Sequence, residues 1–209
     1  MTYKTTTIES YGATADQYTK NVADLAPLQS IDRFAKFLPF QARILDIGCG
    51  SGRDAKEFSD RGAVVLGIDL CPNLVEIAKR TAPKAEFQIM DIENIELPPA
   101  SFDGIWAACS LHHIPKHLFP SVLSKIHELL KEGGYFYLTL KKGSGEVQES
   151  DLRYGDFEKF WAYYDEAELE NLVRAAQFEI LEIKTVEPQS SYNTHTCIRI
   201  FCQKNGPRA

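Results

Sequence analysis

The stretch Ile44-Leu45-Asp46-Ile47-Gly48-Cys49-Gly50-Ser51-Gly52-Arg53-Asp54 decides how the rest of the chain folds. Its apolar start predicts a buried strand, and its three alternating glycines predict a turn that leads into a helix. Backbone N–H groups at such a junction point toward a ligand, and Gly50 leaves the main chain uncovered because it has no Cβ. The stretch therefore predicts a ligand site at the end of the first core strand.

The spacing of the glycines separates two classes of ligand. A dinucleotide-binding turn follows the pattern G-x-G-x-x-G, which needs glycine at position 53, where this chain has arginine. The carboxylate of Asp46 is also poorly suited to a phosphate site, whereas it can accept hydrogen bonds from an ammonium group or from loop N–H groups. The pattern favours a ligand that combines a cationic amino group with a nucleoside.

Strand and helix patterns alternate after this turn. Short apolar runs predict strands, and apolar residues at steps of three and four predict helices. Alternation of this kind implies a parallel sheet with helices on both faces, and the short connection 187–194 implies an antiparallel hairpin at the end. The expected fold is a Rossmann-like α/β sheet of seven strands, mostly parallel, with strands 42–47, 64–69, 85–90, 102–107, 135–140, 178–186 and 195–203 and helices 53–60, 73–80, 119–130 and 169–176.

Acidic residues end the second and third predicted strands. Ligands of open parallel sheets bind at the carboxyl ends of strands, where Asp69 and Asp91 both fall. Asp69 follows the glycine turn at the distance where an acid binds ribose hydroxyls in nucleotide folds. A single aspartate at this position is also a common turn or helix cap, because its oxygen accepts from backbone N–H groups. Two such acids after a glycine turn favour a nucleoside site.

These features together resemble the class I S-adenosylmethionine-dependent methyltransferases, over roughly the middle and end of the chain. The run D-I-G-C-G-S-G is similar to the first motif of that family, Asp69 to its ribose-binding acid, and Asp91-Ile92 to its adenine site. Arg53 and Asp54 resemble the G-R-D-A opening of small bacterial members. The resemblance implies S-adenosyl-L-methionine as cofactor, with binding residues Asp46, Gly48, Cys49, Gly50, Gly52, Asp69, Leu70, Asp91, Ile92, Ala107, Tyr11 and Tyr18.

An N-terminal helical segment precedes the predicted core. Tyr11, Ala15 and Tyr18 recur at helical spacing over residues 11–25, and a second helical pattern ends at Pro39. The aromatic side chains are either a packed stripe or part of a lid over the ligand. Their spacing is similar to a Y-x-x-x-A-x-x-Y element that helps to close the cofactor site of related methyltransferases. We therefore expect a helical lid over residues 1–40 and a single core over residues 41–209.

Three histidines follow the fourth predicted strand, at positions 112, 113 and 117. Pro115 interrupts this segment, so the two-histidine helix face of a metallohydrolase does not form and no metal site is expected. His112 is either structural, or it orients the acceptor and takes its proton. It is the candidate catalytic residue, because methyl transfer requires alignment of the reactants and needs a base only where the nucleophile loses a proton.

Composition narrows the cellular setting and the partners. The chain of 209 residues has a formal net charge of −6, which disfavours unspecific binding to phosphate backbones. Its five cysteines form no C-x-x-C pair, so neither a disulfide framework nor a cysteine-based zinc site is expected. The first residues lack the apolar region of a signal peptide, and no run approaches the length of a membrane span. We therefore expect a cytoplasmic protein without membrane contact; the sequence does not indicate an oligomeric state.

The acceptor side is expected between the N-terminal helices and the segment 141–165, which is predicted to be a loop with an aromatic cluster. Charges cancel between Lys131 and Arg153, so no basic groove is expected and a small-molecule acceptor is favoured. The run Y-Y-D-E-A-E-L at 163–169 loosely resembles wobble-uridine tRNA methyltransferases, which makes tRNA the alternative acceptor. A catalytically silent cofactor-binding sensor or partner subunit is the third possibility.

Overall fold

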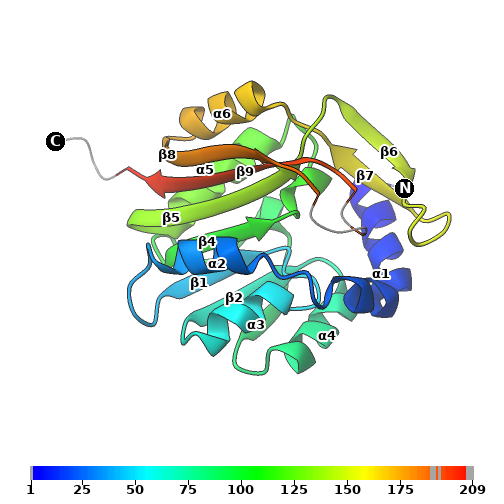
Figure 1. Ribbon diagram of the computed structural model, residues 1–209, viewed down its shortest axis with the longest axis horizontal. Helices are drawn as coiled ribbons and strands as arrows, with labels where there is room; N and C mark the ends of the chain where they lie inside the picture. The colour runs from blue at the N-terminus through cyan, green and yellow to red at the C-terminus, as the bar shows by residue number, and fades with distance from the viewer. Residues whose placement is uncertain (1, 189–191, 193, 206–209) are drawn as a thin grey trace.

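The computed structural model describes residues 2–188, 192 and 194–205 (Figure 1). Five strands pair in parallel, and the last strand pairs antiparallel with both of its neighbours. The predicted seven-stranded Rossmann-like sheet with an antiparallel C-terminal hairpin is thereby confirmed. Across the sheet the strands run in the order β3 (Glu86–Ile89), β2 (Val64–Asp69), β1 (Arg43–Ile47), β4 (Phe102–Ala108), β5 (Leu130–Lys141), β9 (Cys197–Lys204) and β8 (Phe178–Val186).

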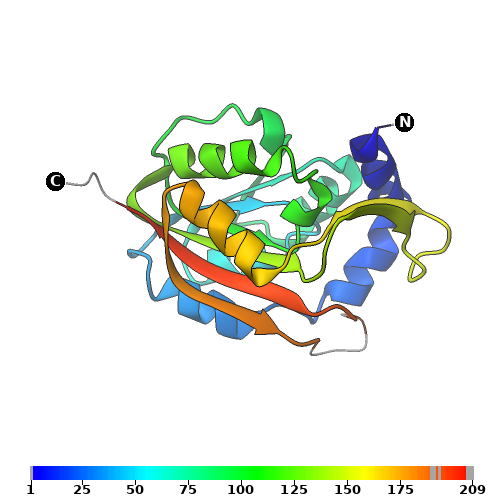
Figure 2. The ribbon, with the colours of Figure 1, turned by 90° about the horizontal axis from the view of Figure 1, so that it is seen from above.

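Helices cover both faces of the sheet, as the alternating pattern predicts. In Figure 2 the sheet lies between α5 on one side and α2 on the other. The apolar stripe of α5 is buried at Phe119, Val122, Leu123 and Ile126, at the steps of three and four that define one helix face. One face packs against α2 (Leu28–Ala35), α3 (Arg53–Asp60) and α4 (Pro72–Thr81), and the other against α5 (Phe119–Leu129) and α6 (Glu166–Ala175).

The N-terminal segment, where a helical lid over residues 1–40 is expected, contributes both to the cavity and to the core. Helix α1 (Tyr3–Val22) starts earlier than predicted, because the hydroxyl of Thr2 caps it by accepting from the Thr5 N–H at 3.2 Å. Helix α2 instead buries Phe34 completely, with its ring 5.3 Å from that of Trp106 in β4. Helix α1, the residues that connect it to α2, and the first turn of α2 line the cavity.

The segment 141–165 is not the loop that the sequence predicts. It contains β6 (Glu146–Ser150) and β7 (Glu158–Ala162), an antiparallel pair in which Val147 lies opposite Trp161. Alternate residues of β7 are buried, with Lys159 and Trp161 only 1% and 4% exposed. The strand packs against α1, where the Phe160 N–H donates to the Thr7 hydroxyl at 3.1 Å. The glycines and aromatic residues of this segment suggested a loop because a local pattern does not reveal a contact with a distant helix.

Two short 3₁₀ helices carry predicted site residues: η1 (Ile92–Asn94) after β3 and η2 (Leu111–His113) after β4. Strand β5 begins at Leu130, five residues before its predicted start, so Gly133 and Gly134 lie inside the strand. No helix in the described part of the chain is long and apolar enough to cross a membrane.

Candidate active site

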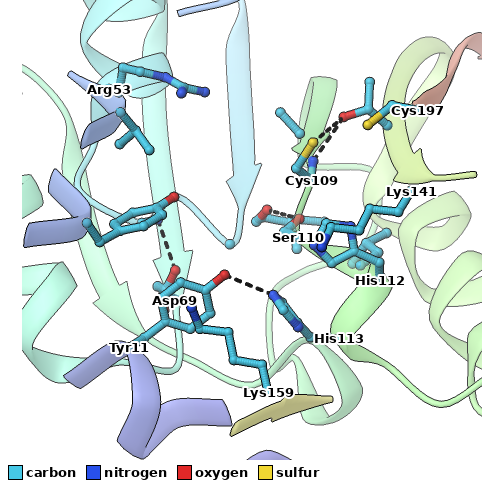
Figure 3. Close-up of a pocket in the computed structure, with 18 of the residues that line it drawn as sticks. Tyr11, Arg53, Asp69, Cys109, Ser110, His112, His113, Lys141, Lys159 and Cys197 are labelled. Atoms are coloured by element: carbon cyan, nitrogen blue, oxygen red, sulfur yellow. Dashed lines mark hydrogen bonds between the residues drawn. The ribbon is translucent and has the colours of Figure 1, made fainter. Parts of the chain in front are cut away.

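A cavity of about 630 Å³ lies at the carboxyl ends of the strands, where ligands of open α/β sheets bind. Its floor is formed by the turns after β1, β2, β3 and β4 and by the end of β5. Helix α1 and strand β7 cover it. Figure 3 shows side chains from α1, β5, β7 and the turns after β1, β2 and β4 around one space. A volume of this size is typical of a small-molecule or cofactor site.

The glycine turn after β1 forms one wall and is locked to the turn after β4. Gly48 has a positive φ of 68°, and a Cβ at this position would lie 2.3 Å from the Cβ of Ser110. The hydroxyl of Ser110 donates to the Ile47 carbonyl at 2.6 Å. Gly50 lines the cavity with its bare backbone, opposite Tyr18. The turn therefore presents main-chain atoms to a ligand, as the sequence predicts.

Asp69 combines the two roles that the sequence left open. One carboxylate oxygen accepts from the Gly50 N–H at 2.9 Å and the other from the Cys71 N–H at 2.8 Å, so it fixes the turn that leads into α4. The same carboxylate lines the cavity beside Leu70. Each oxygen keeps a second lone pair for a ligand hydroxyl. Burial raises the pKa of Asp69, although the backbone N–H groups oppose this shift.

Asp91 also lines the cavity, but the N-terminal helix occupies part of its carboxylate. Lys4 of α1 donates to one oxygen at 2.6 Å, and the Glu93 N–H donates to the other at 2.9 Å. Partial burial raises the pKa of Asp91, but these hydrogen bonds outweigh it and leave the pKa below its ordinary value. Ile92 lies next to it in the wall. The acids at the ends of β2 and β3 therefore converge on one cavity.

Four predicted cofactor residues lie behind the wall: Asp46, Cys49, Gly52 and Ala107. The carboxyl of Asp46 is buried beneath the turn, where burial raises its pKa well above the ordinary value, and one of its oxygens has no hydrogen-bond partner among the described residues. Gly52 supplies the left-handed residue before α3, with φ of 81°. Ala107 points into the apolar core, so its neighbour Ala108 lines the cavity, as strand alternation requires.

Tyr11 and Tyr18 of α1 line the cavity, and His113 holds Tyr11 in place. The Nδ1 of His113 donates to the Phe160 carbonyl at 2.7 Å, so its Nε2 is the acceptor and the hydroxyl of Tyr11 donates to it at 3.0 Å. Burial lowers the pKa of His113 to about 3, which keeps this neutral tautomer. Tyr11 and Tyr18 meet edge to face with ring centroids 5.3 Å apart. Both predicted tyrosines therefore lie in the wall of the cavity.

His112 is buried in the wall, with 2% exposure, and no described residue hydrogen-bonds to its Nδ1. Burial lowers its pKa well below the ordinary value, so the ring is neutral. His117 is exposed and lies outside the cavity. Within the residues that the structure describes, no three histidine, cysteine or acidic side chains cluster as metal ligands do.

The side of the cavity opposite the acids is basic, which the count of charges along the sequence did not predict. Lys141 of β5, Arg153, Lys159 of β7 and Arg199 of β9 all line it. Lys159 and Arg199 lie outside the segment that was counted. Of the acids in that segment, Glu146 accepts from the backbone N–H of Lys116 at the surface, whereas Asp151 pairs with Arg153 and Lys159. Cations from distant parts of the chain thus gather at one side of the cavity, which a count along one segment does not detect.

Arg53 brings a further cation to the glycine turn. Its Nε donates to Asp54 at 2.6 Å, and the other oxygen of Asp54 accepts from the indole N–H of Trp106 at 2.9 Å. Asp54 is only 5% exposed, so this buried carboxylate fixes the guanidinium against the floor of the cavity. Figure 3 shows Arg53 pointing across the space from the side of α3.

Cys109 follows β4 in an unusual conformation, with a positive φ of 54°. Its N–H donates to the Thr139 hydroxyl at 2.9 Å, and its thiol lies 3.3 Å from the same oxygen. Hydrogen bonds from the thiol of Cys197 and from Thr139 lower the pKa of Cys109 to about 6. Both sulfur atoms are seen in Figure 3 at the ends of β4 and β9.

Comparison with known proteins identifies the family. A family model described as a methyltransferase domain matches residues 18–183, which is most of the chain. The chain belongs to the class I S-adenosylmethionine-dependent methyltransferase family. A solved methyltransferase of this type from Methanosarcina mazei is 23% identical, covers 83% of this chain and 97% of its own, and superposes with a TM-score of 0.75. The resemblance drawn from the D-I-G-C-G-S-G motif is therefore confirmed.

Curated methyltransferases match over the core alone. A 27-O-demethylrifamycin SV methyltransferase from Amycolatopsis mediterranei is 38% identical over 112 residues, which are 49% of this chain and 40% of that protein. A ubiquinone biosynthesis O-methyltransferase from Xanthomonas campestris is 32% identical over 103 residues, 47% of this chain and 42% of that protein. The chain thus aligns with less than half the length of these curated methyltransferases.

S-adenosyl-L-methionine, the cofactor of this methyltransferase family, fits the residues at the cavity. The bare backbone at Gly50 leaves room that a side chain would fill, since a Cβ there would already lie 3.4 Å from the Tyr18 hydroxyl. The carboxylate of Asp69 is oriented by two N–H groups and retains acceptor capacity for hydroxyls. The predicted cofactor is therefore consistent with both the family and the donor set.

The sequence did not indicate several residues of this methyltransferase cavity. Lys141 and Lys159 belong to the segment 141–165, where the aromatic cluster that includes Trp161 was expected on the acceptor side but no role was predicted for the lysines. Arg199 belongs to the last strand, far along the chain from the glycine turn. Strand alternation beyond position 140 was the one available signal, because it places Lys141 on the same face as Thr139.

Proposed function

We propose that the chain transfers a methyl group from S-adenosyl-L-methionine to a small organic acceptor. The observation that carries this proposal is the single cavity of about 630 Å³, which joins the glycine turn and its acids to a second compartment of aromatic, histidine and cationic side chains. One enclosed space for both reactants holds them at short range and removes bulk water. Methyl transfer needs this arrangement more than it needs a catalytic triad.

The acidic part of the cavity would hold the cofactor. Asp69 would accept from the ribose hydroxyls, and Asp91 with the Ile92 N–H would bind the adenine, as the family resemblance implies. The guanidinium of Arg53, fixed by Asp54, is suited to the methionine carboxylate. The cofactor supplies the activated methyl group, and the residues of this chain supply binding, alignment and exclusion of water.

The other part of the cavity would hold the acceptor. The rings of His112 and Trp161 lie 5.1 Å apart and, with Tyr11, form an apolar enclosure that opens beside the glycine turn. His112 lines this part of the cavity with a neutral ring, which makes it the candidate to take a proton from an acceptor hydroxyl. Curated relatives from Amycolatopsis and Xanthomonas are both named as enzymes that methylate oxygen, which supports a hydroxyl oxygen as the acceptor atom.

The proposal is tested by incubating the protein and radiolabelled S-adenosyl-L-methionine with a cell extract that is then fractionated into RNA, protein and small metabolites. We expect label in the metabolite fraction and heat of binding with S-adenosylhomocysteine in calorimetry. Label confined to the RNA fraction would replace the small-molecule acceptor with tRNA or another RNA. Binding without transfer in any fraction would favour the cofactor sensor, and no binding of either form of the cofactor would remove the proposal altogether.

A further inference from the structure

Lys141 is the least compensated charge in the cavity. It ends β5, where strand alternation places Tyr137, Thr139 and Lys141 toward the cavity and Leu138 and Leu140 in the core. Its side chain is buried, with 8% exposure, and its ammonium lies 3.1 Å from the centre of the Trp161 ring. Among the residues that the structure describes, no carboxylate forms an ion pair with it. A buried ammonium with only an aromatic partner carries uncompensated charge.

The nearby acid is already engaged by other cations. Asp151 accepts from Arg153 at 2.7 Å and from Lys159 at 2.9 Å, and both contacts are tight. Three cations, Lys141, Arg153 and Lys159, therefore lie near a single carboxylate, that of Asp151, which forms ion pairs with the last two only. Glu187, which also lines the cavity, accepts from the Thr196 hydroxyl at its rim. The local excess of positive charge is left for a ligand to neutralise.

His112 lines the same space, although its Nδ1 is itself enclosed by protein atoms. The Nδ1 of His112 is buried and has no hydrogen-bond partner in the described part of the chain, and His112 lies beside Lys141 in Figure 3. Both residues line the cavity, one from η2 and one from β5. An unpartnered buried nitrogen costs free energy unless a ligand or water satisfies it. Two independent elements thus leave polar groups unsatisfied at one place.

We propose that Lys141 binds an oxyanion of the acceptor in the part of the cavity that His112 also lines. The acceptor is then an organic acid, either a carboxylic acid or an ionised phenol or enol. This inference rests on the proposed methyltransferase function and names the chemical class of its acceptor. A phosphate ester is disfavoured, because this place offers one free ammonium and no cluster of backbone N–H groups.

A purely structural lysine would behave differently. Its ammonium would pair with a carboxylate or reach the solvent, and its removal would destabilise the fold. Lys142, the next residue, is such a lysine: it is exposed on the opposite side of the strand and donates to the Thr185 hydroxyl at 3.2 Å. The variant Lys142→Met therefore removes the same charge without touching the cavity and is the matched control for Lys141→Met.

The test titrates the S-adenosylhomocysteine-saturated protein, under reducing conditions, with benzoate, its neutral analogue benzamide, and 4-nitrophenol. We expect benzoate to bind at least tenfold more tightly than benzamide, and Lys141→Met to abolish that difference. The variant Lys141→Arg should restore part of the preference, and Lys142→Met should keep all of it. For 4-nitrophenol, the absorbance of the ionised form should appear at lower pH when bound than when free.

The outcomes separate the possibilities. Preference for benzoate alone assigns a carboxylate, and a shifted ionisation of 4-nitrophenol assigns a phenol or enol. Equal binding of benzoate and benzamide, retention of the preference in Lys141→Met, or no anion binding in the millimolar range overturns the inference. Calorimetric binding of S-adenosylhomocysteine by the same preparations would then mean that the methyltransferase proposal holds and that only the acceptor class is wrong. A melting temperature of Lys141→Met at or above that of the parent protein excludes misfolding as the cause.

Discussion

The two halves of the cavity carry opposite charge. Asp69, Asp91 and Glu93 lie at the ends of β2 and β3, where Lys4 pairs with the last two, whereas the half at β5 and β7 holds more cations than acids. The methyl donor is a sulfonium with an ammonium group, which matches the acidic half. The basic half matches an acceptor of the opposite charge. The formal net charge of −6 for the whole chain therefore does not predict the charge of either ligand.

The two halves also differ in how the chain builds them. The acidic half comes from consecutive strand ends, so each residue follows directly from its own strand. The basic half combines β5 with a hairpin, which is held in place by α1 from the other end of the chain. Phe160 of β7 contacts both Thr7 and Tyr3 of α1. The cofactor half is thus local in sequence, and the acceptor half depends on long-range packing.

The junction between the halves should be the most sensitive point. Gly48→Ala adds a Cβ that would lie 2.3 Å from Ser110 and forces alanine into a left-handed conformation. We expect the free energy of unfolding to fall by about 2 kcal/mol or more, measured by urea titration. The control Gly62→Ala shares the positive φ but meets no atom within 4 Å. An equal loss in both variants would mean that the contact with Ser110 is unimportant.

The acidic half is tested by Asp69→Ala, which removes the acceptor of two backbone N–H groups and the proposed ribose ligand. Affinity for S-adenosylhomocysteine should fall at least tenfold, which corresponds to about 1.4 kcal/mol, in calorimetry. Removal of an exposed carboxylate by Glu179→Ala should leave the affinity unchanged. Retention of full affinity in Asp69→Ala would reduce this aspartate to a turn-forming residue, and the acidic half would lose its link to the cofactor.

The basic half is tested by pH. Burial, with a further contribution from Arg153, lowers the pKa of Lys141 to about 8. Below that pH the ammonium is charged, so benzoate affinity should be constant, and above it the affinity should fall by up to tenfold for each pH unit. Bound anion favours the charged form and moves the decline to higher pH. The groups that also act on Lys141 are Arg153, Asp151, Cys109, Cys197 and the neutral rings of His112 and His195.

The same shift fixes the sign of the stability change. The folded pKa of Lys141 lies below its ordinary value of 10.5, so between about 8 and 10.5 the unfolded chain binds more protons and this residue makes the ligand-free fold more stable as pH rises. Lys141→Met should abolish both this rise and the decline in benzoate affinity, whereas Lys142→Met should keep them. A benzoate affinity that is flat from pH 7 to 10 in the parent protein would contradict a role for Lys141.

The smallest effect is expected at the contact between α1 and the acidic half. Lys4→Met breaks ion pairs with Asp91 at 2.6 Å and Glu93 at 2.8 Å, which are partly exposed. The free energy of unfolding should fall by less than about 1 kcal/mol, and hydrogen exchange of the amides in α1 should accelerate. The exposed Lys20 of the same helix gives the control Lys20→Met. Unchanged exchange in Lys4→Met would mean that the apolar packing of α1 alone holds the cover in place.

Prediction from the sequence succeeded where each signal is local. The alternation of apolar runs and helical faces gave the order of the core elements, and the residues after β1, β2 and β3 gave the acidic wall. It failed at β7, because an edge hairpin with glycines and aromatic residues has the same local pattern as a loop. It also assigned Ala107 to the wall, where strand alternation places Ala108.

The chain by itself determined a parallel sheet, a glycine turn at its carboxyl edge and the acids that follow, because strand period and turn chemistry act over a few residues. Only the tertiary structure decided that Lys141 and His112 share one enclosure, and that Asp151 is claimed by other cations. Net charge along a sequence has no direction, whereas packing assigns each side chain to the cavity, the core or the solvent. The sign of the acceptor half is therefore a property of the fold.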